Sequence, residues 1–234
     1  MDIEILPAVG FFWDQPWETQ IIEVIEEWRI LSFSAKWLGG IQETHINHTT
    51  DRFLVEQLWK LLDEAEIVVG QNIDRFDIRK INARFLFYDL GPPSPYRTID
   101  TLKIARKNFA LLSNKQYDLG KFMGTGRKLK TDKDLWLDCI KGKEEALERM
   151  KEYNAQDVVL LEANYLKLRA WTKTPNLAIL KEGIACPHCQ SDNIQKRGLQ
   201  RSSTTEYHRI FCSNCKGWSR LSENLRLIKP IVSI

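Results

Sequence analysis

Four of the five cysteines form two Cys-x-x-Cys pairs, and 22 residues separate the last cysteine of the first pair from the first cysteine of the second. Each pair can present two thiolates to one tetrahedral ion, and the gap suits a β-hairpin between two such turns. This spacing predicts one structural Zn²⁺ bound by Cys186, Cys189, Cys212 and Cys215. Two disulfides are the alternative, which the reducing environment inside cells disfavours. Cys139 stands apart and is expected to be a buried free thiol.

Acidic residues at three separate places could bind a metal ion through oxygen. Asp2 and Glu4 alternate with Ile3 on an expected strand, so their carboxylates share one face about 7 Å apart and repel unless a cation lies between them. Asp77 closes the polar segment 72–77, which follows a short apolar strand, and strand ends are where α/β proteins place their chemistry. A solvated N-terminus and a helix-capping cluster are the structural alternatives.

The third acid, Asp157, lies on the clearest expected helix, residues 144–170. Apolar and aromatic residues recur there at spacings of three and four and form one stripe, with Asp157 at its middle and Tyr153 one turn earlier. A carboxylate on a core-facing stripe is costly unless it is paired or bound to a metal. The alternative is a partly exposed aspartate beside a core tyrosine.

In their order and long spacing, these three segments are similar to the motifs of the DEDD superfamily of 3′–5′ exonucleases. Asp2-Ile3-Glu4 matches Asp-x-Glu, the segment from Asn72 to Asp77 matches Asn-x-x-x-Phe-Asp, and the segment from Tyr153 to Asp157 matches Tyr-x-x-x-Asp. The tyrosine marks the subtype with Tyr in its third motif, and the stretch most resembles stand-alone phage-type and polymerase-proofreading members. The resemblance covers residues 1–171 and implies a ribonuclease H-like fold.

The resemblance also implies a reaction, the hydrolysis of phosphodiester bonds by two Mg²⁺ or Mn²⁺ ions that clamp the scissile phosphate. Asp2, Glu4 and Asp157 would hold the first ion. Asp77, with Asp2, would hold the second, and Tyr153 would orient the attacking water. Oxygen ligands of this kind suit Mg²⁺.

Three further residues lie close to these motifs. Asp74 is a second acid in the middle segment, but the family pattern places the catalytic acid after the aromatic residue, which favours Asp77. Asp100 has family counterparts and is interpreted as a structural residue or a neighbour of the ligands. Only Met1 precedes Asp2, where the family has several apolar residues. Either the first strand is short, or the natural start lies upstream of Met1. A terminal ammonium at Met1 would compete with the metal for Asp2.

Basic, amide and aromatic side chains supply predicted contacts to a nucleic acid, because rings can stack on bases and cations can bind phosphates. Core packing or a lid is the alternative for the aromatic residues, a solvated loop for the cations around 124–126, and protein docking for the pair near the cysteines. The predicted contacts are Asn72 in the second motif, Phe12 and Trp13 after the first, Arg127, Lys128 and Lys130 in the basic loop, and Arg209 and Trp218 beside the cysteines.

The elements that must position these residues follow from the hydrophobic pattern. We expect strands over 1–6, 28–38, 41–49 and 67–69, helices over 51–66, 77–89 and 144–170, an N-cap at Thr50 or Asp51, and a strand or helix start at Ile99. This order predicts an α/β fold with a mixed, ribonuclease H-like sheet flanked by helices. The predicted domains are the exonuclease, 1–171, a linker, 172–182, and the zinc ribbon, 183–234.

The composition excludes several classes of protein. Of 234 residues, 43% are hydrophobic and 28% charged, which permits a packed core and excludes wholesale disorder. The net charge of +3 excludes a strongly cationic coating protein, although residues 181–234 carry nine Lys/Arg against four Asp/Glu. No apolar run approaches a membrane span and the first residues are acidic, so an intracellular, cytoplasmic protein is expected. Because the chain resembles phage-type members, we also expect that a virus or phage encodes it.

The leading hypothesis is a metal-dependent 3′–5′ exonuclease that trims single-stranded nucleic acid, with DNA favoured over RNA. The zinc ribbon would bind nucleic acid or a protein, and the expected protein partner is a polymerase or another replication or repair protein. The alternative is an adaptor for nucleic acid or a polymerase, with weak or no catalysis on the same fold.

Overall fold

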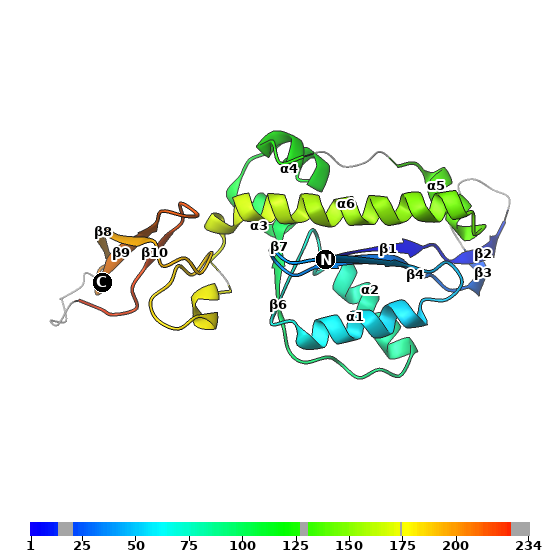
Figure 1. Ribbon diagram of the computed structural model, residues 1–234, viewed down its shortest axis with the longest axis horizontal. Helices are drawn as coiled ribbons and strands as arrows, with labels where there is room; N and C mark the ends of the chain where they lie inside the picture. Colours follow the sequence, from blue (N-terminus) through cyan, green and yellow to red (C-terminus); the bar gives the residue numbers. More distant parts are fainter. Residues whose placement is uncertain (14–20, 127–130, 174, 226–234) are drawn as a thin grey trace. The chain divides into compact units, whose positions relative to one another are not determined.

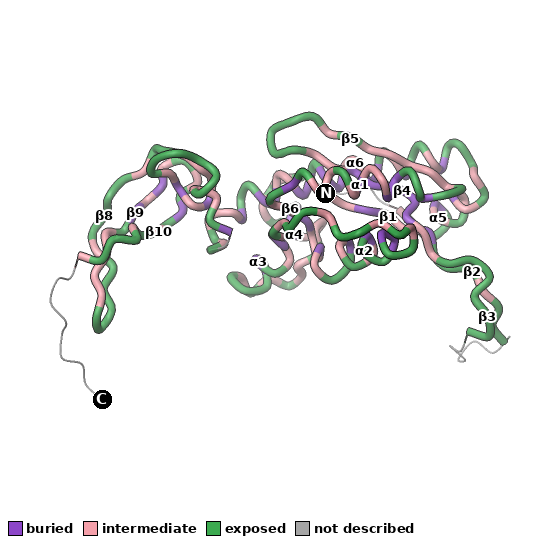
Figure 2. The backbone as a smooth tube through the Cα atoms, turned by 90° about the horizontal axis from the view of Figure 1, so that it is seen from below, coloured by how far each residue is buried: buried purple, intermediate pink, exposed green. Residues whose placement is uncertain are grey.

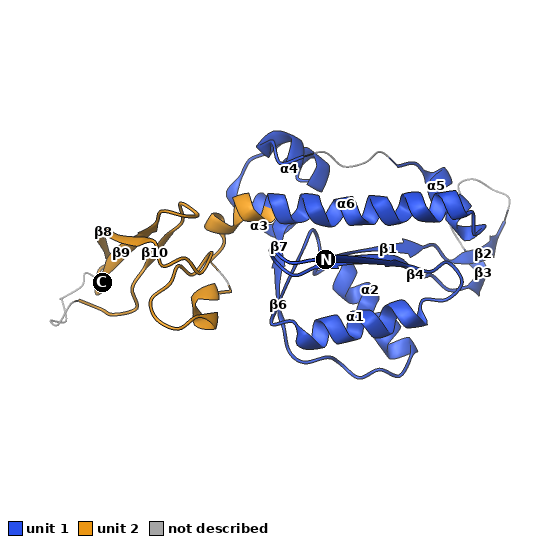
Figure 3. Ribbon diagram, viewed as in Figure 1, with its two compact units in different colours: residues 1–164 blue, residues 165–234 orange. Residues whose placement is uncertain are grey.

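The computed structural model describes residues 1–13, 21–126, 131–173 and 175–225 (Figure 1). The chain divides into two compact units, residues 1–164 and 165–234 (Figure 3). The first unit contains the three acidic segments, and the second contains the four paired cysteines. The linker predicted over 172–182 falls inside the second unit.

The first unit is built on an antiparallel sheet with the strand order β1-β4-β5. Its strands lie close to the predicted ranges and are β1 (Asp2–Leu6), β4 (Arg29–Lys36) and β5 (Gln42–Ile46). In the register of β1 with β4, Asp2 and Glu4 lie opposite serines, whereas Ile3 lies opposite Phe33. The polar and apolar faces of this strand pair therefore separate as the alternation in the sequence predicts.

A parallel strand pair adjoins the start of β1. The pair consists of β6 (Ile67–Gly70) and β7 (Arg97–Asp100). The Met1 amino group donates a hydrogen bond to the Val69 carbonyl oxygen at 2.8 Å, which links β1 to β6. The unit thus combines antiparallel and parallel pairing in an α/β arrangement, as predicted, although the two strand groups form separate hydrogen-bonded sheets.

Helices cover both faces of the β1-β4-β5 sheet (Figure 1). One face is covered by α6 (Glu144–Leu168), and the other by α1 (Arg52–Glu64) and α2 (Asp77–Phe87). The stripe predicted on α6 is buried, since Met150 and Tyr153 are at most 5% exposed. Packing of such a stripe, more than helix propensity, is what stabilises a helix in a protein.

Two apolar clusters hold these layers together. On the α1 and α2 side, Ile3 of β1 packs with Phe33 and with residues of both helices. On the α6 side, Leu6 of β1 packs with Leu31 and Met150. One short strand therefore contributes to both sides of the sheet. Ile3 and Ile5 pack on the α1 and α2 side, and Asp2 and Glu4 alternate with them toward the α6 side.

Three eight-residue helices complete the first unit, namely α3 (Thr101–Asn108), α4 (Gln116–Met123) and α5 (Lys133–Ile140). The sequence predicts neither α4 nor α5, because two turns are too short for a clear periodicity. Instead, burial of Leu119 stabilises α4 and burial of Leu135 stabilises α5. Cys139 on α5 is buried and free, which confirms that prediction. Among the described helices, none combines the length and apolar character that a membrane span requires.

Asp51 occupies the N-cap position of α1, but its side chain does not cap that helix. The buried carboxylate accepts hydrogen bonds from Arg84 Nη2 and the Tyr88 hydroxyl, each at 2.6 Å, and from the Ile30 N–H at 2.9 Å. It therefore ties the start of α1 to α2 and β4. A local sequence rule misses this role because all three partners are at least 21 residues away.

A two-stranded hairpin follows β1 (Figure 2). It consists of β2 (Val9–Phe12) and β3 (Ile21–Glu26), which pair antiparallel, and every residue of β3 is exposed. Phe11, Phe12 and Trp13 are 59%, 67% and 62% exposed. Core packing, one alternative for these aromatic residues, is therefore wrong.

The second unit contains a three-stranded antiparallel sheet with the order β10-β9-β8. The strands are β8 (Ile194–Arg201), β9 (Glu206–Cys212) and β10 (Trp218–Arg220). Two short 3-10 helices, η1 (Arg169–Trp171) and η2 (Leu177–Leu180), precede them. The pair β8-β9 is the hairpin predicted between the two cysteine pairs.

Candidate metal centres

Strand β1 and helix α6 bring three carboxylates together. Asp2 and Glu4 of β1 and Asp157 of α6 each have a carboxylate oxygen within 4.8 Å of those of the other two. Asp157 is only 2% exposed, so the alternative of a partly exposed aspartate at this position is wrong. Three carboxylates this close repel one another, and the repulsion grows with burial, so the arrangement favours a bound cation. We call these residues the three-acid group.

Asn154, three residues before Asp157 on α6, holds the Asp2 side chain in place. Its Nδ2 donates a hydrogen bond to Asp2 Oδ2 at 2.7 Å, and its Oδ1 accepts one from the Ser32 hydroxyl at 3.2 Å. The side chain is fully buried. Sequence reasoning missed this residue, although a spacing of three puts it on the same side of the helix as Asp157.

Asp77 lies beside the three-acid group without being a member of it. It is the first residue of α2, is 3% exposed, and accepts a hydrogen bond through Oδ1 from the Ile3 N–H at 3.1 Å. Ile3 separates Asp2 from Glu4, so the four acids predicted as metal ligands, Asp2, Glu4, Asp77 and Asp157, meet at β1. Burial raises the pKa of Asp77 to about 6, and the hydrogen bond from Ile3 acts in the opposite direction.

The Met1 amino group is buried close to these acids. Burial lowers its pKa, while the negative charges of Asp2 and Asp77 act to raise it. The interaction with Asp2 that the sequence suggests is therefore present, although the hydrogen bond of the amino group goes to Val69.

The second motif forms a turn that is anchored to Asp100. Asn72 has a left-handed backbone, with φ of 61°, and its N–H donates to Asp100 Oδ1 at 2.9 Å. The same oxygen accepts from the Leu102 N–H at 3.0 Å and so caps α3. Asp100 is thus a structural residue of the site, which is one of the two roles that the sequence suggests for it. Asp74 pairs with Lys103 at 2.5 Å and lies outside the three-acid group.

Tyr153 lies on α6 next to Asn154 and is buried. Its ring meets that of Trp136 on α5 edge-on, with 6.1 Å between the centroids. It also belongs to the apolar cluster on the α6 side of the sheet. Packing therefore fixes the direction in which this tyrosine presents its hydroxyl.

An open pocket of about 840 Å³ adjoins Asp2. Asp2 is the one acid among its lining residues, and three cations, Arg75, Arg106 and Lys115, share that lining. Polar side chains fill most of the rest, among them Gln71, Asn72, Ser113, Asn114 and Gln116. Such a lining suits an anionic ligand with many hydrogen-bonding groups. Sequence reasoning missed the three cations because only the fold brings them to one pocket.

The other predicted contacts to nucleic acid lie in different places. Phe12 is the last residue of β2 and Trp13 is the next residue along the chain, so both lie at the exposed hairpin. Arg209 and Trp218 lie on the sheet of the second unit. Arg127, Lys128 and Lys130 lie outside the described residues.

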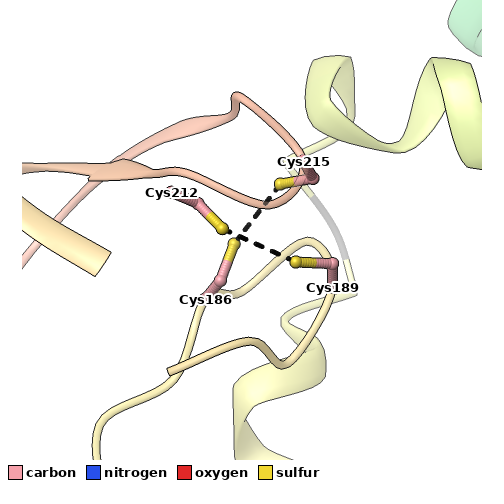
Figure 4. A group of neighbouring side chains, drawn as sticks. All are labelled: Cys186, Cys189, Cys212 and Cys215. Carbon is pink, nitrogen blue, oxygen red and sulfur yellow. Dashed lines mark hydrogen bonds between the residues drawn. The ribbon is translucent and has the colours of Figure 1, made fainter. Parts of the chain in front are cut away.

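The four paired cysteines converge in the second unit (Figure 4). The Sγ atoms of Cys186 and Cys215 are 3.7 Å apart, as are those of Cys189 and Cys212, and all four lie within 4.8 Å of one another. All five cysteines of the chain are free thiols, so the two disulfides considered as an alternative are absent. The cluster could hold one metal ion, and four sulfur ligands are typical of structural zinc.

Comparison of the chain with protein-family models and with curated proteins gives no match. The case for a function therefore depends on the geometry of the two centres and on the motifs in the sequence.

Proposed function

We propose that the chain is a metal-dependent 3′–5′ exonuclease that shortens single-stranded nucleic acid, with DNA favoured. The observation that carries the proposal is the grouping of Asp2 and Glu4 from β1 with Asp157 from α6. These acids belong to the first and third motifs that resemble the DEDD exonucleases, and Asp77 of the second is hydrogen-bonded to Ile3 between them. The resemblance makes the first unit ribonuclease H-like, which its α/β arrangement supports.

The donor set fits two Mg²⁺ or Mn²⁺ ions, because carboxylate oxygens are the ligands these cations prefer. Asp2, Glu4 and Asp157 would hold one ion, and Asp77 with Asp2 would hold the other. When bound, the ions would supply an activated water and charge stabilisation for the phosphate and the leaving oxygen. A cation next to Asp77 would also favour its ionised form, against the burial that raises its pKa.

The chain's own side chains would orient the reacting groups. Tyr153 is fixed by packing and would hydrogen-bond the attacking water through its hydroxyl. Asn154 would keep the Asp2 carboxylate turned toward the metal. Positioning of this kind is a large part of catalysis when the chemistry is carried by bound ions.

The pocket beside Asp2 is the proposed site for the 3′ end of the strand. Arg75, Arg106 and Lys115 would bind its phosphates, and the amide of Asn72 would hydrogen-bond a sugar or base. Because contacts to phosphate carry no sequence information, we expect cleavage to depend little on sequence.

The cysteine cluster is proposed to hold one structural Zn²⁺. Ile210 is the one buried aliphatic residue in the three strands of the second unit, so little apolar burial stabilises this sheet. Metal binding would supply the missing free energy of folding.

A labelled-strand assay tests the proposal. The substrates are a 5′-labelled single-stranded DNA and an RNA of the same sequence, each with Mg²⁺, with Mn²⁺ or without divalent metal. The wild-type chain should produce a ladder of single-nucleotide steps that requires metal, and Asp157→Ala should abolish it. Asp74→Asn is the matched control, because it removes an acid of the second motif that lies outside the three-acid group, and it should cleave like the wild type.

The outcomes separate the hypotheses. Cleavage that survives in Asp157→Ala, or that needs no metal, would overturn the proposed site. Absence of cleavage together with binding of single strands would favour the adaptor. If only the RNA gives a ladder, RNA replaces DNA as the favoured substrate, and the proposed two-metal mechanism is unchanged.

A further inference from the structure

One side of the sheet in the second unit carries three aromatic and three arginine side chains. Residues two apart on a strand share a face, so Tyr207, Arg209 and Phe211 of β9 lie together. On β10, Trp218 pairs with Phe211 and Arg220 pairs with Arg209, which puts both on the same face. Arg197 of β8 reaches this face too, because its guanidinium lies 4.4 Å from the centre of the Phe211 ring. We call these six residues the aromatic–arginine face.

Guanidinium groups and rings alternate across this face. Arg209 lies 5.4 Å from the centre of the Trp218 ring, and Arg220 lies 3.7 Å from that of Tyr207. The Phe211 and Trp218 rings are themselves 5.1 Å apart. Each arginine is thus within cation–π range of a ring, so neighbouring rings hold the guanidinium groups in position before any ligand binds.

The face is exposed and is not the core side of the sheet. Trp218 is 50% exposed, and all three arginines are exposed. The buried residues of β9, Ile210 and Cys212, alternate with these positions and so point to the opposite side. Core packing therefore does not account for three large rings on this side.

The charge of the sheet favours an anionic ligand. Its three strands contain one acid, Glu206, which pairs with Arg201 at 2.5 Å and lies on the opposite face. The cations of these strands are Lys196, Arg197, Arg201, Arg209 and Arg220. A basic protein would be repelled here, whereas a nucleic acid offers phosphates to the cations and bases to the rings.

The cysteine cluster and the face are physically connected. His188 lies between two of the cysteines, is buried, and its Nε2 is 3.2 Å from the Trp218 carbonyl oxygen. This contact holds the start of β10 against the first cysteine turn. The exposed tryptophan therefore sits on a backbone that the cluster makes rigid.

We propose that the aromatic–arginine face binds single-stranded nucleic acid. The Trp218 ring stacks on a base, the adjoining Phe211 extends the stacking surface, and Arg197, Arg209 and Arg220 bind the flanking phosphates. Stacking requires unpaired bases, since those of a duplex already stack on one another. Neither the stacking nor the phosphate contacts read base edges, so binding is independent of sequence.

Fluorescence anisotropy with 5′-fluorescein oligo(dT) of 20 residues tests the face. The full chain carries Asp157→Ala and no divalent metal is added, so binding is measured without cleavage and whether or not the chain is a nuclease. Oligo(U) and a duplex DNA of equal length are parallel probes. Trp218→Ala should weaken binding about 5- to 150-fold, the range for loss of one stacked base, and Trp218→Phe should restore most of it.

Salt dependence isolates the arginines. Arg220→Ala should lower the slope of log Kd against log salt by about 0.7, the value for one phosphate contact to a single strand. Lys196→Ala is the matched control, because it removes the same charge from the opposite face, where Lys196 pairs with Ile210. It should leave the slope unchanged. Thermal unfolding of each variant checks that the sheet is intact.

Three results would overturn the proposal. The first is equal effects of Lys196→Ala and Arg220→Ala on the slope, which would indicate net charge alone. The second is duplex binding as tight as single-strand binding, which would exclude stacking. The third is wild-type affinity in folded Trp218→Ala, after which a protein partner would be the remaining role for the face. Preference between oligo(dT) and oligo(U) distinguishes DNA from RNA as the natural strand.

Discussion

At the scale of single residues, the three-acid group depends on a neighbouring side chain that is not one of the acids. Asn154 donates from its amide Nδ2 to Asp2 and accepts through its Oδ1 from Ser32, so it ties α6 to both β1 and β4. An amide here also leaves the local charge unchanged, whereas another acid would add to the repulsion.

For the proposed exonuclease, replacing Asn154 by Ala should raise the Mg²⁺ concentration for half-maximal cleavage about 10- to 100-fold, the usual effect of losing a group that orients a metal ligand. A Mg²⁺ titration of initial cleavage rates measures this. The control is Asn164→Ala, which removes another buried asparagine of α6 that bonds the Gln116 carbonyl oxygen at 3.2 Å. Equal shifts in the two variants would mean that Asn154 acts only through stability.

Cys139 offers a second prediction at this scale. Its thiol is fully buried, donates to the Ala146 carbonyl oxygen at 3.4 Å, and has a pKa that burial raises to about 11. At pH 8 only about one molecule in a thousand would carry the thiolate, which is the reactive form. In Cys139→Ala, the number of thiols that react with a disulfide reagent only after unfolding should fall by one. A fall in the thiols that react in the native state would show instead that Cys139 is accessible.

Individual site residues could be predicted to the extent that local spacing identifies them. Asp2 with Glu4 follows from strand alternation, and Asp157 from a helical stripe. The cations Arg75, Arg106 and Lys115 could not be found in this way, because each is an ordinary surface residue until the fold brings it to the pocket.

At the scale of elements, the Asp51 carboxylate joins α1, α2 and β4. Asp51→Ala would leave Arg84 buried without its partner and should lower the free energy of unfolding by about 3–5 kcal/mol. Urea unfolding followed by circular dichroism measures the change. The neighbouring exposed pair of Arg52 with Glu56 is the control, and Arg52→Ala should change stability by about 0.5 kcal/mol or less. An equally small loss of stability in Asp51→Ala would show that water solvates Arg84 once the carboxylate is removed.

The elements that the sequence predicts share strong local signals. The strand over 28–38 alternates and ends at a glycine pair, and the helix over 144–170 carries seven turns of pattern, so β4 and α6 follow directly. The hairpin β2-β3 and the helices α4 and α5 lack such signals. The hairpin is apolar on both faces, and its residues are indistinguishable from core residues until exposure is known.

At the scale of the molecule, the two units draw their stability from different sources. The first has apolar clusters on both sides of its sheet, and the second has one buried aliphatic residue in its strands. Cys212→Ser should therefore lose zinc, which metal analysis would detect, and make residues after 164 sensitive to protease while the first unit stays resistant.

Cys139→Ala is the matched control, since it removes a cysteine without touching the cluster. It should keep one zinc per chain and the protease resistance of the second unit. Loss of resistance throughout the chain in Cys212→Ser would show that the two units unfold together.

The β2-β3 hairpin has a consequence for how the protein behaves in solution. Its two short strands expose seven large apolar side chains, Trp13 adds an eighth directly after β2, and Glu23 and Glu26 are the acids of β3. Apolar strands with open edges favour self-association, and like charges on them oppose it. Colloidal stability should therefore be lowest at high salt, where their repulsion is screened. Light scattering against concentration would show this as a rise in apparent mass, and a charged residue in place of Ile22 should suppress it.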